Sequence, residues 1–372
     1  MLQALSRIVA LTRKELLAVL KDPRARNSLL LPPILQCLLF GYAATYDLNH
    51  VPYVVLDRSQ SVASQRLLSE LDGTGIFERV ANLRTQGQVR DAINDRRALL
   101  AVEFPADFAR RLEGRRGADV QIIADGRNSN TAGTALGYAQ SVVNAFNTGW
   151  RADRGLPGPP VTVEARAWYN PNLMTRWNML PGLIGTLTMI QTLMLTAMSV
   201  AREREQGTFD QLLVTPFRPA EIMAGKALPS MLIGIVQATV VLLVTQLWFR
   251  VPFQGSFGTL YAGLTLFVLA AVGIGLVVSA LCQTMQQAML FSFVLIMPFA
   301  LLSGLTTPIS NMPLSLQYFT LVNPLRYAID IAQRVYLEGA GPGVLMPDLW
   351  PLALIAAVTL AAASWLFRYR LQ

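Results

Sequence analysis

Four alternating charges form the most distinctive chemical group in the chain, the charged motif Arg202–Glu205. Apolar runs flank it, from Met179 to Val200 and from Ala227 to Phe249. Ion pairs made by such alternating charges would fix the orientation of a bound partner protein more than they would raise its affinity. Gly207 can take the left-handed conformation that ends a helix. The stretch predicts a structured connector between two membrane spans that can receive force from a soluble partner; an ordinary solvated loop is the alternative.

A second helix is predicted directly after Gly207. Thr208 is its N-cap and Gln211 its capping-box partner. The proline at 216 and the next at 219 end it, because proline does not continue a helix. The residues of this predicted helix that a partner would contact or that bound it are Phe209, Leu212, Leu213 and Pro216.

Few residues are suited to catalysis. His50 is the single histidine, and Cys37 and Cys282 lie in or beside apolar runs, so neither a disulfide framework nor a His- or Cys-based metal site is indicated. Asp57 and Asp125 each end a predicted strand, and we interpret them as loop ends and helix caps rather than a catalytic pair. No P-loop lysine motif occurs, so ATP chemistry belongs to another polypeptide. We predict no catalytic residue, no metal and no cofactor.

The composition indicates a membrane protein. Of 372 residues, 53% are hydrophobic, and the excess is concentrated in runs of bilayer length. The formal charge of +8 fits positive cytoplasmic flanks. Arginines do not interleave with aromatic residues on one face, so nucleic acid is not an expected partner.

The N-terminal third divides into three parts. The pattern of residues 1–27 predicts an amphipathic helix at the cytoplasmic surface of the membrane. Residues 28–46 are the first predicted span, and its Pro32 and Pro33 require packing inside a bundle. Residues 47–172 alternate between strand-like and helix-like runs, which predicts an α/β domain. Its predicted strands are 51–57, 76–83, 99–105, 118–125 and 161–169.

The remaining part, 173–372, is predicted to carry transmembrane helices 2–6. Its five apolar runs are 177–201, 222–248, 258–282, 286–304 and 349–367. Lysine and arginine cluster before the first span, in the segment 202–219 and at the C-terminus, which places these parts and both termini inside. The 47–172 domain is then outside.

Uncharged polar residues inside the spans have two interpretations. They line a translocation path, or they form hydrogen bonds between helices, which we favour. The candidates are Gln191, Thr196, Gln237 and Gln246. Ala271, Gly275 and Ser279 form a ridge of small residues that predicts close helix packing, within a protomer or across a dimer.

The charged motif also carries a family resemblance. The pattern E-R-E-x-G-T-x-x-x-L-x-x-T-P resembles the first cytoplasmic coupling segment of type-2 ABC exporter permeases. The matching residues are Glu203, Arg204, Glu205, Gly207, Thr208, Leu212, Thr215 and Pro216. Three further stretches resemble the same family, Tyr169 to Ile184, Ser303 to Pro313 and Asn323 to Gln333. The resemblance covers nearly the whole chain.

The resemblance implies a six-span permease subunit in a bacterial inner membrane. Two permease protomers, identical or paired homologues, join two cytoplasmic ABC ATPase subunits that contact the coupling segment 202–219. The cargo is drug-like, hydrophobic or amphipathic small molecules, and a periplasmic adaptor protein and an outer-membrane channel are further expected partners beside membrane lipid. The segment 303–334 is expected to form short re-entrant helices on the outer side, around Gly304, Pro308, Asn311, Pro313, Asn323 and Pro324.

Within that segment, Arg326, Asp330 and Arg334 are spaced to form a ladder of ion pairs on one helix face. Two other classes of function remain open. One is a multi-span anchor that presents an extracytoplasmic binding domain without transport. The other is a membrane enzyme, which would need an intramembrane histidine or carboxylate constellation that the sequence lacks.

Overall fold

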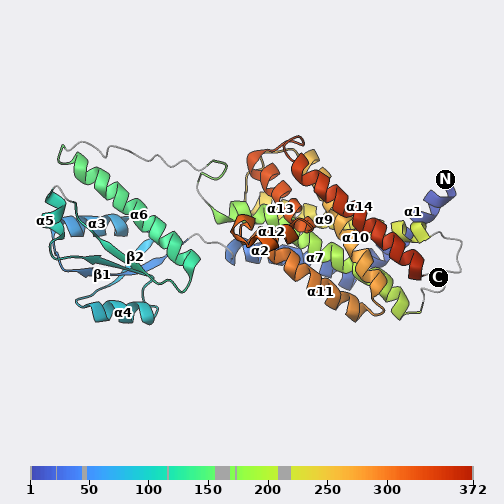
Figure 1. Cartoon of the computed structure of the whole chain (residues 1–372), viewed down its shortest axis with the longest axis horizontal. Helices are drawn as coiled ribbons and strands as arrows, with labels where there is room; N and C mark the ends of the chain where they lie inside the picture. The colour runs from blue at the N-terminus through green and yellow to red at the C-terminus, as the bar shows by residue number, and fades with distance from the viewer. Residues whose placement is uncertain are drawn as a thin grey trace. The chain divides into compact units, whose positions relative to one another are not determined.

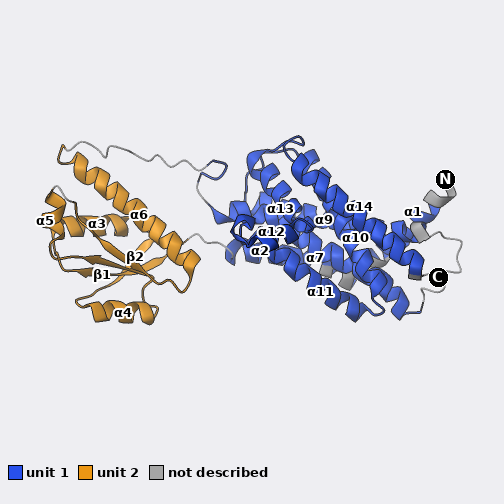
Figure 2. Ribbon diagram, viewed as in Figure 1, with its two compact units in different colours: residues 1–45, 167–372 blue, residues 46–166 orange. Residues whose placement is uncertain are grey.

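The chain forms two compact units in the computed structural model (Figure 2). The helical unit comprises residues 1–45 and 167–372, and the α/β unit comprises residues 46–166. The structure describes residues 2–21, 23–43, 48–114, 117–155, 168–171, 174–207 and 219–370. The predicted second helix of the coupling segment lies outside these residues. So does most of the predicted strand 161–169, of which the described Trp168 and Tyr169 are not in a strand.

The described residues of the α/β unit form a four-stranded sheet and four helices (Figure 1). The strands lie in the order β2-β1-β3-β4, with β1 parallel to both neighbours and β4 antiparallel to β3. The predicted alternation of strands and helices is therefore confirmed for the first four strands. The elements are β1 (Val51–Asp57), α3 (Val62–Gly73), β2 (Phe77–Asn82), α4 (Gln86–Asn94), β3 (Leu100–Phe104), α5 (Phe108–Glu113), β4 (Gln121–Ala124) and α6 (Ser129–Ala152).

Strand β1 is buried on both faces, which explains its unbroken apolar sequence. Tyr53 and Val55 pack in one core with residues of α3 and α6, whereas Val54 and Leu56 pack in a second core with residues of α4. Figure 1 accordingly shows α4 on one side of the sheet and α3 and α6 on the other. The unit has two hydrophobic layers of its own.

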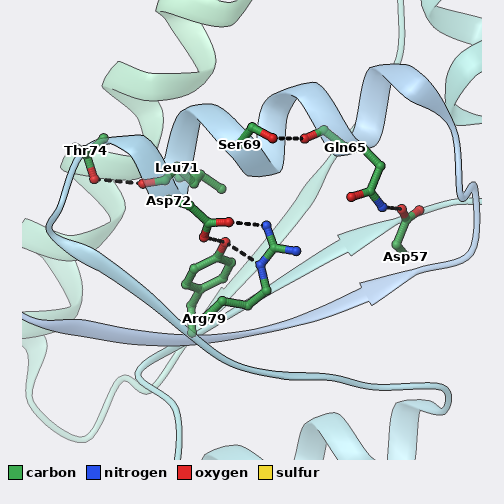
Figure 3. A network of polar contacts seen from close by, with 8 residues as sticks. Asp57, Gln65, Ser69, Leu71, Asp72, Thr74 and Arg79 are labelled. Carbon is green, nitrogen blue, oxygen red and sulfur yellow. Dashed lines mark hydrogen bonds and ion pairs between the residues drawn. The ribbon is translucent and has the colours of Figure 1, made fainter.

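A buried tyrosine links α3 to the sheet (Figure 3). The Tyr53 hydroxyl donates to the Asp72 carboxylate at 2.5 Å, and Arg79 Nε donates to the same hydroxyl at 3.2 Å. Arg79 also pairs with Asp72. Burial, together with the hydrogen bond to Asp72, raises the pKa of Tyr53. The network satisfies polar groups at the edge of the core and fixes α3 against β1 and β2.

The two aspartates at strand ends have structural roles, as interpreted from the sequence. Asp57 accepts the backbone N–H of Ser59 and of Gln60 at 2.9 Å, and the Ser64 hydroxyl at 2.7 Å. Hydrogen bonds from Arg127 lower the pKa of Asp125 to about 2. Both carboxylates serve turns and caps.

The helical unit is built from long apolar helices and several short ones. Its elements are α1 (Leu2–Lys21), α2 (Pro23–Ala43), α7 (Thr175–Glu205), α9 (Pro219–Leu243), η1 (Val244–Trp248), α10 (Phe257–Leu281), α11 (Met285–Leu301), η2 (Ile309–Asn311), α12 (Leu314–Thr320), α13 (Pro324–Gln333), η3 (Arg334–Glu338) and α14 (Met346–Arg370).

Among the described residues, four helices are long and apolar enough to cross a membrane, namely Thr175–Glu205, Glu221–Trp248, Phe257–Leu281 and Met346–Tyr369. Two shorter apolar helices, Leu29–Ala43 and Met285–Leu301, coincide with the predicted first and fifth spans. The chain is thus a largely helical membrane protein, and six spans remain a prediction. The first of these apolar stretches lies in α2, which begins at Pro23, a residue well suited to a first helical position.

We predict that residues 46–166, expressed alone, form a soluble and compact α/β domain, because both faces of the sheet are covered within the unit. Tyr53→Phe should lower its free energy of unfolding by about 1 kcal/mol, the net contribution of one hydrogen bond. Circular dichroism measures the secondary structure of the isolated domain, and urea titration measures its free energy of unfolding. A disordered wild-type product, or a phenylalanine variant of unchanged stability, would contradict the assignment.

Candidate functional site: the charged end of helix α7

The charged motif is the last turn of α7 and not the start of a loop. The helix continues through Glu205, so the predicted coupling segment 202–219 begins inside the last turn of α7. Gly207 then has a φ of +68°, and its N–H donates to the Arg204 carbonyl at 3.1 Å. The predicted left-handed helix stop is therefore observed, and Thr208, Phe209, Leu212, Leu213 and Pro216 lie outside the described residues.

Glu203 forms an ion pair with a lysine of α9. Its Oε2 lies 2.8 Å from Lys226 Nζ; the lysine side chain is fully buried and that of Glu203 is 10% exposed. Lys226 is not among the site residues predicted from the sequence, although a single lysine inside an apolar helix is itself a signal. Removing one partner of such a buried pair costs about 3–5 kcal/mol, because the other charge is left uncompensated.

Arg204 binds the end of a different helix. Its Nη1 donates to the carbonyl oxygens of Ala280 and Cys282, each at 3.1 Å. These carbonyls belong to the last turn of α10, where no further helical N–H is available to them. The guanidinium both satisfies the carbonyls and complements the negative end of the helix dipole.

Glu205 binds the start of a third helix. Its Oε2 accepts the backbone N–H of Met285, the first residue of α11, at 2.8 Å. Thr284 caps the same end by accepting the N–H of Gln287 at 3.2 Å. A carboxylate at this position is favourable because the N-terminal N–H groups carry partial positive charge.

Three consecutive charges thus contact three different helices. Glu203 pairs with a lysine, and Glu205 binds a helix N-terminus. Arg202 and Glu205 are exposed, Arg204 is partly buried and Glu203 is buried. The end of α7 is therefore held to α9, α10 and α11 by one charged side chain each.

The polar candidates for a translocation path differ in how deeply they are buried. Thr196 is fully buried, donates to the Thr192 carbonyl at 2.6 Å and packs on Gly275 of α10. Gln237 is 3% exposed, whereas Gln191 and Gln246 are half-buried. Thr196 bonds within its own helix, and the buried Oε1 of Gln237 has no hydrogen-bond partner among the described residues. Both interpretations of these residues stay predictions.

The ridge of small residues on α10 packs inside one chain. A Cβ added to Gly275 would lie 2.7 Å from Thr196 Cβ and 3.0 Å from the Leu193 carbonyl of α7. Ser279 Oγ accepts the N–H of Val200 at 3.2 Å. Of the two arrangements expected for this ridge, the structure shows the one within a protomer.

The expected re-entrant segment consists of short helices. Gly304, in the turn after α11, has a φ of +91°, and Pro308 and Pro313 precede η2 and α12. Asn323 caps α13 by accepting the N–H of Leu325 at 3.0 Å, and it donates to the Phe299 carbonyl at 2.8 Å. Pro324 is the first residue of α13. Pro308, Pro313 and Asn311 are exposed, whereas Asn323 and Pro324 are buried.

A pocket of about 550 Å³ is lined in part by two of the segments that carry the family resemblance, 169–184 and 323–333. Gln333 Nε2 of α13 donates to the Asn178 carbonyl of α7 at 3.0 Å. Arg334 pairs with Asp330 at 3.4 Å and also with Glu338 and Asp348. Of the predicted ladder, the pair between Asp330 and Arg334 is present, whereas Arg326 donates to Thr320. The pocket is lined by Trp168, Tyr169, Asn170, Asn178, Asp330, Gln333, Arg334, Leu337 and Glu338.

Comparison with known proteins decides the family. Residues 28–365 match the family described as "ABC-2 family transporter protein". The chain belongs to the ABC-2 family of transporter proteins. As a family of transporter permeases, it is not itself an enzyme family, and among the described residues no group of three or more His, Cys, Asp or Glu is placed to hold a metal ion.

Its relatives have permease names. The "Probable multidrug ABC transporter permease YbhR" of Escherichia coli strain K12 is 40% identical over 98% of this chain and 99% of the relative. The "Probable multidrug ABC transporter permease YbhS" of the same strain is 28% identical over 97% of this chain and 96% of the relative. The "Inner membrane transport permease YhhJ", also from that strain, is 28% identical over 87% of this chain and 86% of the relative.

We predict that Gly207→Val destabilises the end of α7 by about 1 kcal/mol or more, because a β-branched residue resists the left-handed region. A Cβ at this position would have no neighbouring atom within 4 Å among the described residues, so the effect comes from backbone strain alone. Gly207→Asn is the matched control, since asparagine tolerates this conformation. Hydrogen exchange of residues 200–207 measures the fraying. Equal protection in both variants would show that the turn is not required.

Proposed function

We propose that this chain is the transmembrane permease subunit of an ABC exporter. It moves hydrophobic or amphipathic small molecules out of the cytoplasm or inner membrane, with ATP hydrolysed by a separate ATPase subunit. Family membership and the multidrug permease names of YbhR and YbhS support this function. The absence of a P-loop lysine motif in the sequence is the reason for assigning ATP hydrolysis to a partner.

The observation that carries the proposal is the end of α7. A coupling element must pass force to several membrane helices, and Glu203, Arg204 and Glu205 each contact a different one. In this proposal the ATPase binds the segment after Gly207 and moves the end of α7. The contacts with α9, α10 and α11 then carry the motion into the bundle.

The proposed assembly contains two permease protomers and two ATPase subunits in a bacterial inner membrane. Helices α2, α7, α9 with η1, α10, α11 and α14 are the six spans, and both termini are cytoplasmic. Exposed apolar side chains on α11, among them Leu290, Phe291, Phe293 and Val294, face lipid or the second protomer. The adaptor protein and the outer-membrane channel stay predictions from the family resemblance.

Topology is tested with two exposed positions, Ser129 on α6 and Gln206 at the end of α7. Both native cysteines are buried and are first replaced by alanine. We expect Ser129→Cys to react with an impermeant thiol reagent in intact spheroplasts, and Gln206→Cys to react only after lysis. The reverse pattern would place the α/β unit in the cytoplasm.

The coupling role is tested at Leu212. We expect Leu212→Asp to leave the permease inserted, because the position is outside the apolar runs. The variant should weaken co-purification of the ATPase or uncouple hydrolysis from export, since an apolar side chain buried at an interface contributes roughly 1.5–3 kcal/mol. Leu212→Met is the control that keeps the apolar contact.

Complex yield, ATPase rate and export are compared for the wild type and both variants. Wild-type values for Leu212→Asp would show that the segment only connects two helices. A wild-type chain that binds no ATPase and exports nothing would instead favour the alternative, a multi-span anchor for the α/β unit.

A further inference from the structure

Lys226 is the most buried charge in the described part of the helical unit. Its side chain has no exposed area, and its ammonium group lies beside three acceptors. Glu203 Oε2 of α7 is at 2.8 Å, Glu15 Oε1 of α1 at 3.4 Å, and Ser199 Oγ of α7 at 3.5 Å. A lysine ammonium has three hydrogens to donate, so three acceptors match its donors.

Two of these acceptors come from distant parts of the sequence. Glu15 and Lys226 are 211 residues apart in the chain, and their ion pair links α1 through Lys226 to the last turn of α7. The carboxylates of Glu15 and Glu203 both contact the Lys226 ammonium. Each of them helps to compensate the buried positive charge of the lysine. The lysine therefore joins α1, α7 and α9 at one point.

Helix α1 contacts α9 at two further points. Arg7 pairs with Glu221 at 3.7 Å, and Leu11 packs on Gly225 so closely that a Cβ there would lie 2.4 Å from the leucine. Leu11 is 6% exposed. Residues 7, 11 and 15 follow at helical spacing, so one face of α1 follows the start of α9.

We infer that Lys226 is a pivot that makes α1, the end of α7 and the start of α9 move as one body, with Glu15 as the positioning residue that attaches α1. This inference rests on the proposed function, because the body it defines includes the charged motif. Helix α1 is then part of the force path from the ATPase and not a passive interface helix. Glu15 acts on Glu203 through Lys226, which both carboxylates contact.

The test compares two ion pairs that join the same two helices. Glu15→Ala removes the pair that reaches the charged motif, and Arg7→Ala removes the pair that does not. In the permease–ATPase complex, Glu15→Ala should lower export per ATP hydrolysed by about fivefold or more, the low end of coupling between distinct sites. Complex yield should stay unchanged. Glu15→Gln, which keeps an acceptor oxygen, should restore part of the coupling.

A second measurement uses the permease itself. Spin labels at the exposed positions Lys14 and Gln206 report the distance between α1 and the end of α7. The distance distribution should be narrow in the wild type and in Arg7→Ala, and broad in Glu15→Ala.

Distributions that are equally narrow in all three would overturn the inference. So would equal losses of coupling in Glu15→Ala and Arg7→Ala, because general docking of α1 would then explain both. A wild-type permease that binds no ATPase would refute the proposed function instead, and the label distances would still decide the role of Glu15.

Discussion

The helical unit depends on one geometric constraint at the end of α7. Successive residues of an α-helix point about 100° apart, so three consecutive charges cannot face the same neighbour. Glu203, Arg204 and Glu205 face α9, α10 and α11 in turn. Because each charge contacts a different helix, the start of α9, the end of α10 and the start of α11 must all lie near the end of α7.

Electrostatic complementarity explains which charge binds which helix. The arginine meets the C-terminal carbonyls of α10, and the glutamate after it meets the N-terminal N–H of α11. Reversing the two signs would set like partial charges against each other at both helix ends. The sign of each charge thus matches the helix end that it faces: the positive Arg204 faces a C-terminus and the negative Glu205 faces an N-terminus.

The sequence predicted features that depend on local pattern. The alternation of strand-like and helix-like runs located four strands and their helices, and the left-handed stop at Gly207 followed from its lack of a side chain. It did not predict the partners of the charged motif, because Lys226 and the end of α10 lie about 20 to 80 residues away and nothing local signals their approach. The contact between α1 and α9 was missed for the same reason.

The way in which the last turn of α7 faces its neighbours also limits how this chain can change length in evolution. Insertion or deletion of a single residue within α7 would rotate Glu203, Arg204 and Glu205 together by about 100° relative to the start of the helix. Each charge would then face the wrong helix, although every residue of the motif was still present. Substitutions along the less buried side of α7 leave this phase unchanged. Natural variants of the chain should therefore differ in length in the loops and the α/β unit, while α7 keeps a fixed residue count between its first turn and Gly207.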